Sequence, residues 1–164
     1  MTERDLGTLQ LMNAIIDESM RAFNGLKSAT EQTIQQATED VKKRMDDMVA
    51  EAAAECQSLA KTTDKEAKKT VSDAIKSYQQ TVSSAEKDAS QAISNAWKTT
   101  RDQLSNVLEQ AKTTLGKQAT DLDKVLKEVI KYMDKVVADY TKMVRDYAKM
   151  AQNSLSELSK QYLK

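Results

Sequence analysis

The chain has 164 residues, with 25 Lys plus Arg balanced by 25 Asp plus Glu, and it contains no His, no Pro and one Cys. The lack of His removes the commonest general base and metal ligand, so Ser-His and Cys-His nucleophiles cannot form within the chain. A single Cys excludes an intrachain disulfide and a zinc site built from several cysteines. We therefore expect a chain that is not an enzyme, with no catalytic residues, no cofactor and no metal.

Helix is expected nearly everywhere, because Pro is absent and Ala, Lys, Glu, Gln, Met and Leu are abundant. Apolar residues recur at intervals of three and four, the spacing of an amphipathic helix. They never alternate with polar residues, although alternation is the pattern that a strand requires. The segments predicted to be helical are residues 8–24, 27–61, 64–115 and 120–163. Together they predict an all-α fold, an elongated antiparallel helical bundle or coiled coil with long amphipathic helices, as a single domain over residues 1–164.

Three breaks in the apolar pattern separate these predicted helices. The first lies at Asn24-Gly25. The second, at residues 62–64, contains a Thr followed three residues later by a Glu, as in a capping box. The third, at residues 116–120, begins with a Gly. We expect the chain to reverse direction at the second and third breaks.

The last predicted helix carries the clearest apolar face. Three positions in every seven are apolar, which makes a stripe wider than the seam of a two-stranded coiled coil. Such a helix needs neighbours on two sides, as in a bundle of three or four helices. We expect this stripe to be packed and take it as the candidate interaction face. Its members are Leu122, Leu126, Val129, Ile130, Met133, Val136, Val137, Tyr140, Met143, Val144, Tyr147 and Met150.

The middle of the chain is different, because residues 83–96 carry almost only small residues on the predicted apolar side. That side includes Ala92 and Ala96, after which the mean spacing approaches four and drifts toward an eleven-residue repeat. Trp97 follows directly, either as an anchor at the edge of the core or as an exposed anchor for a partner. Cys56 lies among Ala and Leu residues and is expected to be a small buried thiol.

Charge and hydropathy narrow the classes of partner. The basic runs are short, the net charge is zero and few aromatic residues lie between the runs. These features disfavour nucleic acid as a partner. No apolar run approaches the roughly 18 residues of a transmembrane segment, and acidic residues near the N-terminus argue against a signal peptide. The expected location is therefore intracellular, in the cytoplasm. The leading hypothesis is a structural or interaction protein that self-associates or binds another helical protein.

The alternative is an amphipathic-helix protein that coats a lipid or polymer-granule surface. Residues 92–111 (AISNAWKTTRDQLSNVLEQA) are similar to the helical repeats of phasins, and the Ala-, Lys- and Gln-rich chain also resembles exchangeable apolipoproteins. That resemblance implies surface coating. Residues 62–90 are similar to late-embryogenesis helices, which usually lack an apolar face as firm as that of residues 122–151. Against coating, helices at lipid interfaces usually carry bulkier Leu, Phe or Trp than the small-residue centre does.

Overall fold

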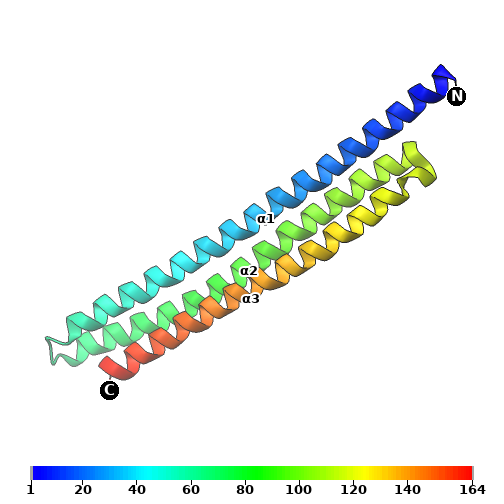
Figure 1. Ribbon diagram of the computed structural model, residues 1–164. Helices are drawn as coiled ribbons and strands as arrows, with labels where there is room; N and C mark the ends of the chain where they lie inside the picture. The colour runs from blue at the N-terminus through cyan, green and yellow to red at the C-terminus, as the bar shows by residue number, and fades with distance from the viewer. Residues whose placement is uncertain (1, 164) are drawn as a thin grey trace. The chain divides into compact units, whose positions relative to one another are not determined.

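The computed structural model describes residues 2–163 and shows an all-α, bundle-like fold, as the sequence predicts (Figure 1). Helix α1 spans Glu3–Leu59, α2 spans Lys65–Leu115 and α3 spans Thr120–Tyr162, and the short 3-10 helix η1 spans Gly116–Ala119. No strand occurs in the described residues. At about 1.5 Å per residue, the 57 residues of α1 extend for about 85 Å.

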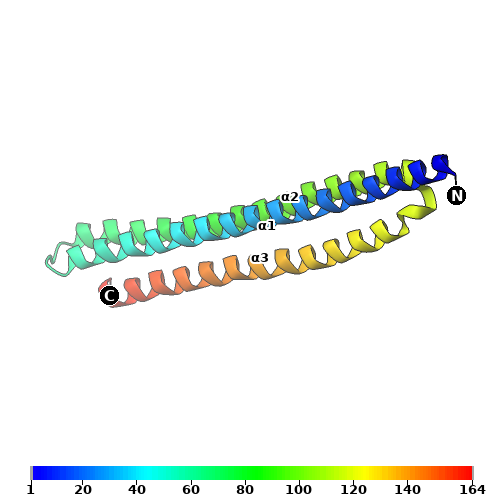
Figure 2. The same ribbon diagram turned by 45° about the horizontal axis from the view of Figure 1, so that its top comes forward.

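The chain forms two compact units, and each of the three long helices contributes to both. The first unit comprises α1 up to Ile34 together with Ser94–Ala138. The second unit comprises Gln35–Ile93 together with α3 from Asp139 onward. In each unit α2 runs antiparallel to α1 and to α3 (Figures 1 and 2). The assignment of one domain to the whole chain stays a prediction.

Helix α1 is continuous, so the predicted break at Asn24-Gly25 between the first two predicted helices is wrong. A Gly inside a helix costs about 1 kcal/mol relative to Ala. Phe23 and Thr30 on either side are nevertheless buried, and Leu26 between them is half-buried. Packing on both sides of the Gly holds the helix together and outweighs the local preference for a break.

Both predicted reversals of chain direction are confirmed. At the first, Asp64 rather than Thr63 caps α2, because its carboxylate accepts a hydrogen bond from the backbone N–H of Glu66 at 3.0 Å. At the second, Gly116 has a φ of 57°, the left-handed conformation that ends many helices and that Gly adopts without strain. The chain therefore turns at both places where the local sequence predicts a turn.

The cores follow the spacing of three and four on all three helices. The buried residues of the first unit are Ser19, Phe23, Thr30, Ile34, Trp97, Thr100, Leu104, Leu108, Ala111, Leu115, Ala119, Leu122, Leu126, Val129, Met133 and Val136. Those of the second unit are Thr38, Val41, Met45, Met48, Ala52, Cys56, Leu59, Val71, Ile75, Val82, Ala85, Ala89, Ile93, Val144, Ala148, Ala151 and Leu155. The hydroxyl groups of Thr30 and Thr100 hydrogen-bond to each other inside the first core. Each helix thus covers most of its apolar stripe within the chain.

The buried face of α3 changes position after Val136, which corrects part of the predicted stripe. From Val136 to Val144 to Ala148 the buried residues advance in steps that are multiples of four. Because four residues turn a helix by slightly more than 360°, these steps rotate the buried face. Met143 and Met150, expected in the same column as Val136, are consequently 38% and 65% exposed.

Helix α2 shows the same rotation. Its buried residues continue from Ala89 to Ile93 and Trp97 in steps of four. Ala92, expected on the apolar side, is therefore exposed, and Ala96 is only half-buried. The predicted drift toward an eleven-residue repeat is present, but it begins before Ala96 and brings the larger Ile93 and Trp97 into the core.

Replacing Val136 with Asp should lower the free energy of unfolding by about 3 kcal/mol or more, because it places an unpaired charge in the first core. Met143→Asp is the matched control, seven residues later on the same helix, where the side chain is exposed. It should cost about 0.5 kcal/mol or less. Thermal and urea unfolding followed by circular dichroism measure both. Equal losses for the two variants would contradict the described change in the buried face.

Candidate interaction surfaces

The predicted interaction face of α3 lies largely inside the two cores. Its buried members are Leu122, Leu126, Val129, Met133, Val136 and Val144. Its half-buried members are Ile130, Val137, Tyr140 and Tyr147. Only Met143 and Met150 are exposed. While the units stay folded, most of this face packs within the chain and is not available to a partner.

Trp97 is buried and joins α2 to α3 in the first unit. Only 6% of the residue is exposed, and its indole N–H donates a hydrogen bond to Oδ1 of Asp134 at 2.8 Å. A Trp with its apolar body packed and its N–H partnered is a typical core anchor. This position matches the edge-of-core interpretation. A role as an anchor for a partner stays a prediction, and it requires the indole to leave this place.

Aromatic and polar side chains join α1 to α3 within each unit. In the first unit, the Tyr132 hydroxyl donates to Oε1 of Glu31 at 2.9 Å, and Nζ of Lys27 lies 4.0 Å from the centre of the Tyr132 ring. In the second unit, Nζ of Lys42 lies 5.7 Å from the centre of the Tyr147 ring. Contacts of this kind are worth about 0.5–1 kcal/mol each at exposed sites. They therefore contribute little to the overall stability of the fold.

Two titratable groups in the second unit are held in their protonated forms. The Tyr78 hydroxyl lies 3.3 Å from a carboxylate oxygen of both Glu51 and Glu55 and shares its one donor hydrogen between them. Burial, followed by the negative charges of Glu55 and Glu51, raises the pKa of Tyr78 to about 12. Burial and then Glu55 also raise the pKa of the Cys56 thiol. Nucleophiles are activated by the opposite change, a lowered pKa.

The described residues offer little for metal chemistry or for crossing a membrane. Over residues 2–163, no group of three or more Cys, Asp or Glu side chains is arranged to hold a metal ion. In the same range, every helix falls short of the combined length and apolarity that a membrane span needs.

The first turns of α1, residues 3–14, which we call the N-terminal segment, were not predicted as an interaction surface. The helix starts at Glu3, five residues earlier than expected, because Thr2 and Asp5 cap it reciprocally. The Thr2 hydroxyl donates to Oδ2 of Asp5 at 2.8 Å, and the Asp5 amide donates to the Thr2 oxygen at 3.2 Å. The Thr2 hydrogen bonds lower the pKa of the Asp5 carboxyl. The helix start is thus locally fixed.

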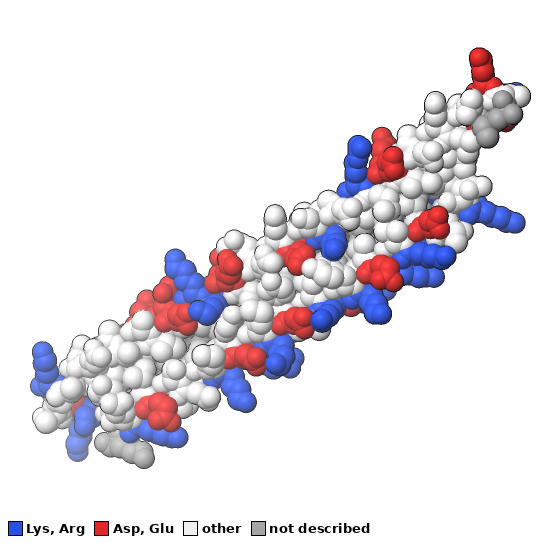
Figure 3. Space-filling view, viewed as in Figure 1, with Lys and Arg blue, Asp and Glu red and all other residues white. Residues whose placement is uncertain are grey.

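The N-terminal segment exposes three large apolar side chains. Leu6, Leu9 and Leu11 are 48%, 43% and 59% exposed, and all described residues before Met12 are exposed. Residues 6–16 carry no charged side chain, the longest such run in the chain. In Figure 3, uncharged surface lies between charged groups near the N-terminal end of α1. An apolar, charge-free surface of this kind is typical of a docking surface.

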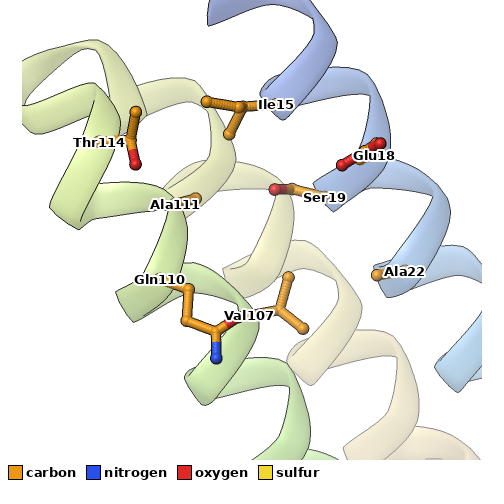
Figure 4. Close-up of a pocket in the computed structure, with 8 residues that line it drawn as sticks. All are labelled: Ile15, Glu18, Ser19, Ala22, Val107, Gln110, Ala111 and Thr114. Carbon is orange, nitrogen blue, oxygen red and sulfur yellow. The ribbon is translucent and has the colours of Figure 1, made fainter.

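The reason for this exposure is that α2 ends before the N-terminal segment begins. In the first unit, a groove between α1 and α2 has Ile15 on one wall and Thr114 on the other, one residue before the end of α2 (Figure 4). Because the two helices are antiparallel, the residues of α1 before Ile15 extend past the end of α2. At about 1.5 Å per residue, they continue for about 18 Å.

The groove itself has a volume of about 340 Å³. Small side chains, those of Ser19 and Ala22 on α1 and Ala111 on α2, leave it open (Figure 4). Its complete lining is Ile15, Glu18, Ser19, Ala22, Val107, Gln110, Ala111 and Thr114. The groove and the N-terminal segment adjoin at Ile15. They form one continuous candidate surface, in which the apolar N-terminal segment adjoins a groove of mixed polar and apolar lining.

Spectroscopic titration should show one of the five tyrosines ionising near pH 12. Tyr78→Phe should remove this component, and a Glu51→Gln/Glu55→Gln variant should lower the Tyr78 pKa without abolishing the shift, because burial is its largest cause. The raised pKa in the folded state makes Tyr78 stabilising below pH 10, and this contribution is lost as pH rises toward 12. An unchanged titration curve for Tyr78→Phe would contradict the assignment.

Comparison with known proteins finds no match to a family model, to a curated protein or to a solved structure.

Proposed function

We propose that this chain is a non-enzymatic structural or interaction protein that associates with itself or with another helical protein. The observation that carries the proposal is the contrast along α1. From Ser19 onward its apolar face is mostly buried against the other helices, whereas Leu6, Leu9 and Leu11 are exposed. A helix that continues past its intramolecular partners with large apolar side chains exposed presents a ready contact for another helix.

The shape of the surface favours a helical partner. The groove between α1 and α2 has two helical walls, and the ridges of a third helix fit between such walls. Its floor is made of small side chains, so a backbone is able to approach closely. Glu18 and Gln110 at its edge supply hydrogen-bonding groups at the rim. A surface that combines apolar area with hydrogen-bonding groups is common in protein–protein interfaces.

Coating of a lipid or polymer-granule surface remains the second candidate, and the composition of the cores favours it. Several buried positions are Ala or Thr, among them Ala85, Ala89 and Thr100. Ala buries little apolar area, so separating the helices costs less than in a Leu-rich core. An opened chain would expose the stripe of α3. Against this candidate, the N-terminal segment carries Arg4 as its only cation, whereas surface-binding helices are usually rich in Lys and Arg.

Gel filtration coupled to light scattering, with and without lipid vesicles, separates the two candidates. We use vesicles of phosphatidylcholine alone and with phosphatidylglycerol, and add a neutral-lipid droplet emulsion as a third surface. The proposed function predicts discrete species whose mass is unchanged by lipid, because the cores are already filled. A monomer that transfers to vesicles or droplets and loses its cooperative unfolding would establish the coating function instead.

A further inference from the structure

We propose that the partner of the N-terminal segment is a second copy of this chain, with the two α1 helices packed antiparallel about Leu11. This inference rests on the proposed function and specifies the partner of the same surface. In the paired arrangement, Leu11 of each copy lies against Leu11 of the other. The first turns of each copy then lie over the groove of its partner.

The charges around Leu11 favour this arrangement. Arg4 lies seven residues before Leu11 and Glu18 lies seven residues after it. Seven residues are nearly two helical turns, so all three side chains lie on one face of α1. In an antiparallel pair centred on Leu11, Arg4 of each copy meets Glu18 of the other, which gives two ion pairs. A parallel pair would place Arg4 against Arg4 and Glu18 against Glu18, which is repulsive.

The sizes of the side chains agree with the same register. Gly7 lies four residues before Leu11 and Ile15 lies four residues after it, so they face each other across the pair. A Cβ built on Gly7 meets nothing within 4 Å in the single chain, and the missing side chain leaves room for the Ile15 side chain of a second copy. Gly7 of each copy therefore makes room for Ile15 of the other, so the same fit occurs twice, once on each side of Leu11.

The groove completes the interface. Ile15 and Glu18 belong both to the pairing face and to the groove wall, so the partner's residues near Arg4 and Gly7 lie over the groove. A specific interface generally buries about 1,200–2,000 Å² in total, and smaller ones are transient. A two-fold arrangement uses segment and groove twice, so the area buried by one copy's segment is doubled. Of the three exposed leucines, the pair covers Leu11, whereas Leu6 and Leu9 lie on other sides of α1.

The first test measures self-association of the full chain by sedimentation as a function of concentration. Leu11→Glu should weaken the dimer about tenfold or more, since it places two carboxylates at the centre of the interface. It should leave unfolding nearly unchanged, because Leu11 is exposed in the single chain. Met150→Glu is the matched control, also an exposed apolar residue but in the second unit, and it should not change the dimer.

The second test examines the register by charge reversal. Arg4→Glu and Glu18→Arg should each weaken the dimer about threefold to tenfold, because two ion pairs become repulsive in each variant. The double variant should restore association to near the original strength, since the pairs are then reversed but intact. A merely structural role for either residue would give additive losses in the double variant.

The outcomes for the partner and for the proposed function are distinguishable. If the chain self-associates but Leu11→Glu has no effect, or the double charge reversal gives no rescue, the antiparallel pairing is wrong and the proposed function stands. If the chain is a monomer at all concentrations and ignores lipid, the second copy is wrong as the partner, and another helical protein takes its place. If the chain transfers to vesicles or droplets as an opened monomer, both proposals are wrong.

Discussion

The structure depends on keeping one apolar stripe in phase along helices of 43 residues or more. A helix has 3.6 residues per turn, so a strict seven-residue repeat drifts around its surface unless the helices supercoil or the repeat is interrupted. Here successive steps of four residues make the interruption, through Ala89, Ile93 and Trp97 in α2 and up to Ala148 in α3. This change decides that Trp97 is buried and that Met150 is exposed.

Because the apolar stripe of each helix stays turned toward the other helices, the chain covers most of its own apolar residues. Little exposed apolar surface is then available to a partner. The exception is where the helices differ in extent. Helix α1 continues past the end of α2 near Ile15, so Leu6, Leu9 and Leu11 stay exposed within the first unit. The candidate surface thus arises from an offset between two helix ends. It needs no unusual residue and no strained backbone.

The sequence predicts the features that depend on local chemistry. Absence of Pro and the apolar spacing indicate an all-α fold, and Gly116 marks the second reversal because its left-handed conformation ends a helix. Features that depend on distant residues are missed. Helix α1 passes through Gly25 because residues on both sides pack on other helices, and sequence spacing near Asn24 contains no sign of them. The exposure of Leu11 likewise depends on where α2 ends, about a hundred residues away in the chain.

Amide hydrogen exchange, measured at a concentration low enough to keep the chain monomeric, tests the central claim most directly. The claim is that the three helices fill their own cores and leave only the start of α1 outside. It predicts slow exchange in α1 from Ser19 onward and throughout the buried face of α3, with fast exchange in residues 3–14. Uniformly fast exchange in α3, or protection in residues 3–14 equal to that of the core, would contradict it.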